Sequence, residues 1–106
     1  MVLEIAVFDI KPTMVERFEE LGREVARYLE QGDTKGSHSF RLIKAIEDPN
    51  RFVFHVIWDR VEDHAALGET AFSDRVSAVT LECLASEPVV HHYTIVDGTA
   101  VGEIRI

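Results

Sequence analysis

Apolar residues recur along the chain with two different periods, and each period predicts one kind of element. Four runs rich in β-branched and aromatic residues predict strands: residues 2–10, 39–46, 52–58 and 89–96. Apolar residues at steps of three and four over 14–29 predict an amphipathic helix that packs on a core. A second helical pattern begins near Val61 and ends before Pro88. An interruption at Gly68 leaves open whether it forms one kinked helix or two short ones.

Capping signals precede both helical patterns. Thr13 and Glu16 form a T-x-x-E capping box at the start of the first helix. Asp59 and Glu62 form a similar box directly after the third strand. Thr70 is a candidate N-cap for a second segment of the later helix.

The order of the elements is β-α-β-β-α-β, the split βαβ pattern of ferredoxin-like folds. We therefore predict an α+β domain with a four-stranded antiparallel sheet. Right-handed crossovers place its two helices on one face of the sheet. The domain spans residues 1–97, and residues 98–106 form a C-terminal extension with strand character.

The third strand is apolar on both of its faces. Trp58 and Phe54 lie on one face and His55 on the other, because side chains alternate along a strand. We place the Trp58 face under the helices and expect the open face to carry these side chains: Ala6, Phe8, Ile43, Val53 and Ile57. A bare apolar sheet is costly in water, so we predict a symmetric homodimer that packs sheet against sheet, a dimeric α+β barrel. The C-terminal extension is expected to add to that interface.

Composition narrows the class of the protein rather than its function. The 106 residues and the 46% hydrophobic fraction suit one globular domain. The formal net charge of −8, without any basic cluster, argues against nucleic acid or an anionic membrane as a partner. The sequence has no signal-peptide pattern and no apolar run approaching the roughly 20 residues of a membrane span. Together with the single Cys83, these features predict a cytoplasmic protein.

Three side chains on or near the third strand are candidates for chemistry. Trp58, the only tryptophan, could stack on a flat substrate or donate its indole N–H, although a core Trp at a strand end is equally expected. His64, in the next helix, could accept a proton from a phenol, or could simply face solvent. Lys44 could stabilise a phenolate, or its stem could extend to the rim. A hairpin symmetric about its turn places Lys44 opposite Phe54, on the Trp58 face.

The histidines form no local metal-binding pattern. His91 and His92 are adjacent on a strand and therefore point to opposite faces, one toward the pocket and one toward the partner. We take His91 and Tyr93 as substrate-binding candidates. The sequence has no C-x-x-C, H-x-x-x-H or phosphate-binding loop, so we expect neither a metal nor another cofactor.

Several stretches resemble the antibiotic biosynthesis monooxygenase family over residues 2–97. The resemblance rests on VIWDRVEDHAAL at the end of the third strand, Phe72 after the helix break, and EPVVHHYTIV with its P-x-x-x-x-Y pattern. It implies a dimeric α+β barrel. It also implies the activity of the family's small cofactor-independent oxygenases, which act on aromatic polyketides or quinols. Relatives of the same fold degrade haem or isomerise lactones.

Four positions depart from the patterns of this family. Phe54 stands where polyketide-oxidising members have an Asn, and His64 stands where they have a Tyr. Ala66 stands where many members have a His. Val76 occupies the position of the axial His of haem-degrading relatives, which argues against haem ligation.

The resulting prediction is a cofactor-independent monooxygenase for a small aromatic or quinol substrate. Trp58 and His64 are its catalytic candidates, and four residues are candidates for substrate binding: Lys44, Phe54, His91 and Tyr93. Two alternatives stay open. One is a non-catalytic or stress-type barrel dimer that binds a hydrophobic small molecule, and the other is a His-based isomerase. A cavity beneath Trp58 would favour an enzyme, whereas a filled core would favour the non-catalytic role.

Overall fold

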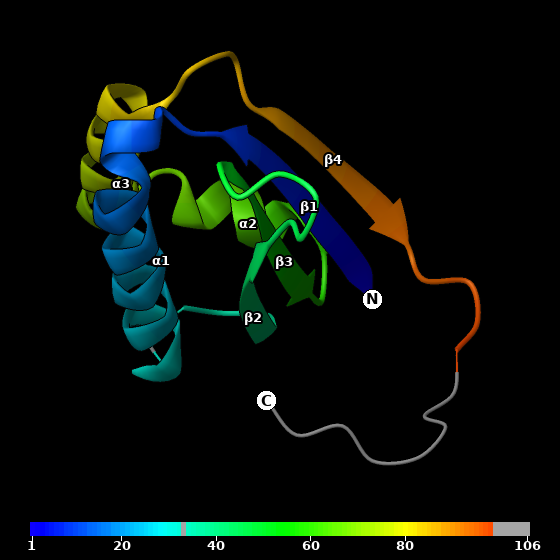
Figure 1. Ribbon diagram of the computed structural model, residues 1–106. Coiled ribbons are helices and arrows are strands. Elements are labelled where there is room, and N and C mark those ends of the chain that lie inside the picture. Colours follow the sequence, from blue (N-terminus) through cyan, green and yellow to red (C-terminus); the bar gives the residue numbers. More distant parts are fainter. Residues whose placement is uncertain (33, 99–106) are drawn as a thin grey trace.

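A four-stranded antiparallel sheet with helices on one face forms the fold in the computed structural model, which describes residues 1–32 and 34–98 (Figure 1). The elements follow one another in this order: β1 Val2–Asp9, the 3-10 turn η1 Pro12–Met14, α1 Val15–Glu30, β2 Ser37–Lys44, β3 Arg51–Trp58, α2 Val61–Leu67, α3 Ala71–Cys83 and β4 Val89–Thr94. The strands lie in the order β2-β3-β1-β4, which confirms the ferredoxin-like prediction.

The helical pattern after Trp58 forms two helices, α2 and α3, rather than one kinked helix. Residues 99–106 of the predicted C-terminal extension lie outside the described residues. The expected contribution of this extension to an interface therefore stays a prediction. No helix within the described ranges 1–32 and 34–98 is long and apolar enough to span a membrane.

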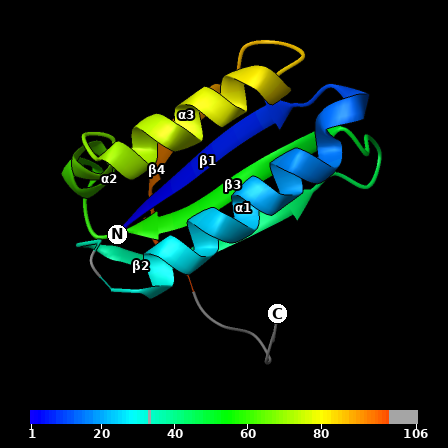
Figure 2. The ribbon, with the colours of Figure 1, turned by 90° about the vertical axis from the view of Figure 1, so that its left-hand side faces the viewer.

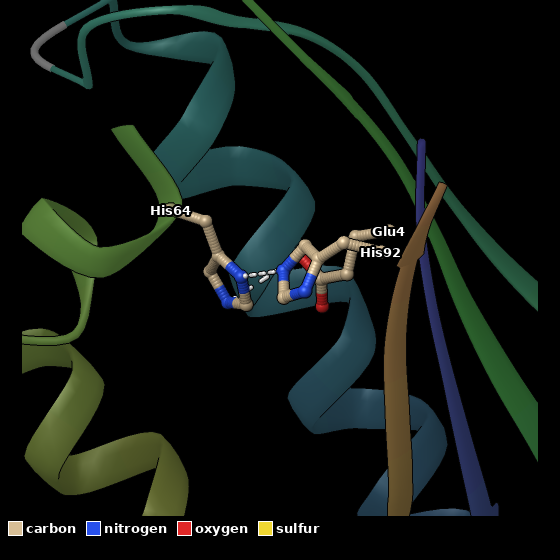
Figure 3. A group of neighbouring side chains, drawn as sticks. All are labelled: Glu4, His64 and His92. Atoms are coloured by element: carbon tan, nitrogen blue, oxygen red, sulfur yellow. Dashed lines mark hydrogen bonds and ion pairs between the residues drawn. The ribbon is translucent and has the colours of Figure 1, made fainter. Parts of the chain in front are cut away.

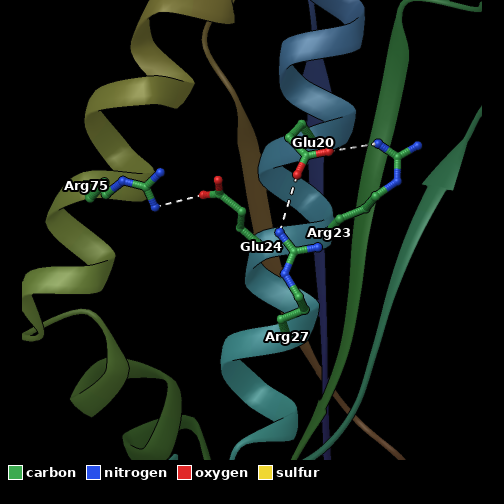
Figure 4. Close-up of polar contacts among 5 residues, drawn as sticks. All are labelled: Glu20, Arg23, Glu24, Arg27 and Arg75. Carbon is green, nitrogen blue, oxygen red and sulfur yellow. Dashed lines mark hydrogen bonds and ion pairs between the residues drawn. The ribbon is translucent and has the colours of Figure 1, made fainter.

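Helices α1 and α3 lie side by side across the same face of the sheet (Figure 2). Three side-chain contacts join them along α1, and the first is the ion pair of Arg17 with Glu82 at 3.4 Å. Arg75 donates to the Glu24 carboxylate at 2.7 Å (Figure 4), and this bond lowers the pKa of Glu24. The rings of Tyr28 and Phe72 stack with their centroids 3.9 Å apart. Two polar contacts and one aromatic contact therefore join the two helices.

Phe18 is the centre of the aromatic core between α1 and the sheet. Its side chain is 0% exposed. Its ring centroid lies 5.1, 5.4 and 5.5 Å from those of Phe8, Phe52 and Phe54. Phe18 lies on the apolar stripe of α1 with Leu21 and is the point where that stripe meets β1 and β3.

The predicted position of Ala6 and Phe8 on the open face is wrong. Both are buried beneath the helices, because Ala6 pairs with Phe54, and Phe8 with Phe52, across the β1–β3 ladder. Residues directly opposite one another on antiparallel strands share a face. The open face of β1 therefore carries the alternate residues: Leu3, Ile5 and Val7. The open face is apolar, as predicted, but Ala6 and Phe8 do not belong to it.

Two of the three predicted helix caps are absent. Neither α1 nor α2 has a side-chain cap; their N-cap residues are Met14 and Arg60. Before α1 the turn η1 intervenes, and the Met14 N–H donates to the backbone carbonyl of Lys11, the residue before that turn. The Asp59 carboxylate contacts His38 instead of the α2 amides. The third cap is confirmed, since Thr70 Oγ1 accepts from the Ser73 N–H at 3.1 Å.

Candidate functional site

A cavity of about 400 Å³ lies between the helices and the sheet. Its walls are mainly apolar, with aromatic side chains from strands and helices alike: Phe8, Phe40, Phe54, Trp58 and Phe72. The helical contribution comes from α1, α2 and α3. A cavity of this size is in the usual range for a small-molecule site.

Glu4 is a charged residue within the otherwise apolar inner face of β1. It is 5% exposed and alternates with the buried Ala6 along the strand. Trp58 Nε1 donates to Glu4 Oε1 at 2.9 Å. This bond explains how the Trp58 indole N–H is satisfied in the core, and it fixes the carboxylate at the wall of the cavity.

Two imidazoles meet beside Glu4, one from α2 and one from β4. His64 Nδ1 lies 2.7 Å from His92 Nε2, and Figure 3 shows the two rings facing one another. His64 Nε2 lies 3.4 Å from Glu4 Oε1, and its ring stacks on Trp58 with centroids 5.3 Å apart. A proton on His64 Nε2 faces the carboxylate favourably, which leaves Nδ1 as the acceptor of a proton from His92.

The electrostatic environment favours the neutral form of His64. Burial lowers its pKa most; Glu4 acts in the opposite direction, and the neighbouring His92 lowers it further. The net effect is a pKa below the ordinary value of 6.5. An imidazole that is neutral near pH 7 has a lone pair available to accept a proton.

Three of the sequence-predicted site residues lie in the cavity wall. Trp58, Phe54 and His64 all line it, and Trp58 and His64 are also in contact with one another. The core beneath Trp58 therefore contains a cavity rather than being filled by side chains. Such a cavity favours an enzyme over the non-catalytic alternative.

Lys44 lies on the predicted face but outside the cavity lining. The hairpin places it opposite Phe52 rather than Phe54, because Ala45 and Arg51 close the hairpin and Ile46 belongs to the loop. Its ammonium group donates to Glu19 of α1 at 3.1 Å. The expected place beside the substrate is wrong, since the register differs by two residues from the symmetric hairpin.

His91 and Tyr93 lie on the open face of the sheet. They pair with Ile5 and Leu3 of β1, whose side chains point away from the helices. His92, opposite Glu4, is the histidine that reaches the site. The predicted placement of His91 and Tyr93 in the pocket is therefore wrong. The register between β4 and β1 decides which residues of β4 face the helices, and the sequence of β4 alone does not contain it.

Glu4 and His92 are the site residues that sequence reasoning missed. A signal existed for Glu4, because a lone carboxylate at an alternate position of an apolar strand is expected to be buried and therefore partnered. His92 carries no such signal, because the alternation of a strand does not say which of two neighbouring histidines faces inward.

The sequence profile that describes antibiotic biosynthesis monooxygenases matches residues 1–71. The chain belongs to this family. The match contains Glu4, Trp58 and His64 of the site, whereas His92 lies beyond it. No curated protein matches the chain significantly.

Solved structures that bear the family's name share the fold. A protein from Bordetella bronchiseptica is 31% identical, with a TM-score of 0.76, over 90% of this chain and 96% of that chain. One from Nitrosomonas europaea is 23% identical, with a TM-score of 0.83, over 92% of this chain and 100% of that one. One from Deinococcus radiodurans is 12% identical, with a TM-score of 0.83, over 97% of this chain and 100% of that one.

Proposed function

We propose that the protein is a cofactor-independent monooxygenase that acts on a small aromatic or quinol substrate. The observation that carries this proposal is the cavity of about 400 Å³ whose apolar, aromatic wall ends in the Glu4–His64 pair. Apolar walls with a few convergent polar groups are typical of sites that orient a small organic molecule. Membership of the monooxygenase family adds support, although it names no substrate.

His64 is the proposed base. A substrate hydroxyl takes the place of His92 as the partner of Nδ1 and donates its proton there. Glu4, facing Nε2, holds the ring and stabilises the positive charge that forms on it. Enzymes often transfer a proton through a chain of three groups. The chain begins at a hydroxyl, continues through an imidazole and ends at a buried carboxylate.

Oxygen is the second substrate in this proposal. The deprotonated ring is electron-rich and transfers its electrons to O₂. One oxygen atom enters the ring, and the other leaves as water with the two hydrogens that the substrate loses. The substrate is thus the only reductant, and the protein supplies binding, deprotonation and exclusion of water.

Oxygen uptake on a panel of anthrones and hydroquinones tests the proposal with chelator-treated protein. Trp58→Phe is expected to lower the rate roughly 10- to 100-fold, because the Glu4 carboxylate loses the donor that positions it, and small misplacements of catalytic groups cost about this much. Circular dichroism serves as the folding control. No uptake with any substrate, or equal rates in the two proteins, would contradict the proposal.

A His-based isomerase is the second candidate, because the Glu4–His64 pair can move a proton without oxygen. The two functions are separated by repeating the turnover assay under nitrogen. Substrate conversion that continues without oxygen supports the isomerase. Binding of hydrophobic compounds with no conversion at all would instead support the non-catalytic alternative.

The cytoplasmic location stays a prediction from the sequence. We also infer that the protein forms a homodimer through the open face of the sheet. The support is the exposed or half-exposed apolar surface of that face: Leu3, Ile5, Val7, Ile43, Val53, Ile57, Val89 and Tyr93. His55 lies on the same face, and among the described residues its buried Nδ1 has no hydrogen-bond partner. A second sheet would cover the apolar residues.

Val53→Glu is expected to convert the dimer into a monomer. Val53 lies on the open face of a central strand, between Val7 and Ile43, so a carboxylate there would be buried without a partner. Light scattering is expected to give about twice 12.0 kDa for the wild type and 12.0 kDa for the variant. Ile46→Glu is the matched control, because Ile46 is 94% exposed in the hairpin loop. A monomeric wild type would contradict the inference.

A further inference from the structure

Three metal-ligating side chains from three separate elements meet beside the cavity wall. Glu4 comes from β1, His64 from α2 and His92 from β4, and one ligand atom of each lies within 4.8 Å of the other two. The three are spread over the chain, so no local spacing motif announces them. We propose that Glu4, His64 and His92 form a binding site for a divalent transition-metal ion of the zinc type.

The distances between the three side chains suit an ion after small rotations. Nitrogen and oxygen ligands lie about 2.0–2.2 Å from zinc, so two ligand atoms of a tetrahedral site are separated by about 3.3 Å. His64 Nδ1 and His92 Nε2 are 2.7 Å apart and would move slightly outward. The ligand atoms all lie within 4.8 Å of one another, so side-chain rotations would close the remaining separations.

The donor set selects the class of ion. Two imidazoles and one carboxylate are ligands that zinc and its neighbours in the transition series accept readily, whereas magnesium and calcium prefer sites built from oxygen alone. Three protein ligands leave at least one coordination position free. Glu4 and His64 both line the cavity, so an ion bound by the three side chains would lie at its wall, within reach of a bound molecule.

The surroundings of Glu4 support a cation at this place. The carboxylate is 5% exposed, and Trp58 Nε1 donates to its Oε1 at 2.9 Å. A hydrogen-bond donor on a ligating carboxylate fixes the ligand and is typical of metal sites. The free energy cost of burying a carboxylate falls when a cation lies beside it, and among the described residues no lysine or arginine forms an ion pair with Glu4.

The metal site goes beyond the proposed monooxygenase function and does not rest on it. An ion bound to His64 and His92 would occupy the lone pair that the proposed proton transfer requires. Metal loading is therefore expected to inhibit cofactor-independent oxygen uptake, and the activity assays use chelator-treated protein for this reason. Metal binding itself is measured without any substrate.

Cobalt titration of the chelator-treated full-length protein tests the proposal. Co²⁺ bound by nitrogen and oxygen ligands absorbs visible light, and zinc calorimetry then gives stoichiometry and affinity. We expect one ion per chain in the wild type. His92→Gln is expected to weaken binding at least about 100-fold, since even the loss of a group that supports a ligand can cost about 10–100-fold. His92 is exposed on β4, so this change should leave the fold intact.

His91→Gln is the matched control. It removes the neighbouring imidazole of the same strand, which points to the other face of the sheet, and is expected to leave the affinity unchanged. Glu4→Gln is a second variant, since its amide oxygen can still accept from Trp58 while its charge is lost. No binding by the wild type, or equal loss in the two histidine variants, overturns the proposal. Neither result would bear on oxygen uptake by the metal-free protein.

Discussion

His64→Gln is expected to lower the rate of oxygen uptake by about 10²–10⁴-fold, the range in which a positioned general base contributes to catalysis. The amide keeps much of the size and polarity of the imidazole but cannot accept a proton near neutral pH. His64 is the residue that contacts Glu4, His92 and Trp58 together, and it lines the cavity. Its loss should therefore affect turnover far more than binding of a substrate analogue.

His38→Gln is the control for this experiment. His38 contacts the exposed Asp59 on the protein surface and lies outside the cavity wall. Its replacement is expected to leave both the rate and the affinity unchanged. If His64→Gln retains the wild-type rate, His64 is not the base, and the proposed mechanism fails even if the cavity binds the substrate.

Phe18→Ala is expected to lower the free energy of unfolding by about 3–5 kcal/mol, the usual cost of removing a buried phenylalanine. Phe18 is 0% exposed and contacts the rings of Phe8, Phe52 and Phe54. Those rings belong to β1 and β3, so the cavity left behind would lie where α1 meets the sheet. Domains have a total stability of about 5–15 kcal/mol, so the variant would be close to unfolding.

Urea denaturation followed by circular dichroism measures this effect. Leu81→Ala is the matched control, because Leu81 also lies on a helix but is 71% exposed, and substitutions at such positions usually change stability by less than about 0.5 kcal/mol. A loss of less than about 1.5 kcal/mol for Phe18→Ala would mean that neighbouring side chains fill the space, and that Phe18 is not the centre of the core.

The fold could be predicted from the sequence because its signals are local and redundant. The period of α1 and the alternation in β1 and β3 each identify an element without reference to the others. The connection rules for a β-α-β-β-α-β chain then leave few arrangements. The break at Gly68 and the cap at Thr70 were also visible, and they mark the boundary between α2 and α3.

The site could be predicted only where its residues are close in sequence. Trp58 and His64 flank one strand-to-helix connection, so the local pattern placed them together. Lys44, His91 and His92 depend on pairing between strands, and a shift in register changes the position or the face of every residue in a strand. Glu4 and Trp58 are 54 residues apart in the sequence. Only the pairing of β1 with β3 in the sheet brings them into contact.

The sequence of β4 has a consequence for how the site could change in evolution. Along Val89–Thr94, neighbouring residues form similar pairs, Val89 with Val90 and His91 with His92. An insertion of one residue in the connection from α3 would exchange the two faces of this edge strand. His91 would then lie opposite Glu4 and Val89 opposite Ala6, in place of His92 and Val90. The tandem histidines would thus keep a partner for His64 after an insertion that would remove it in most strands.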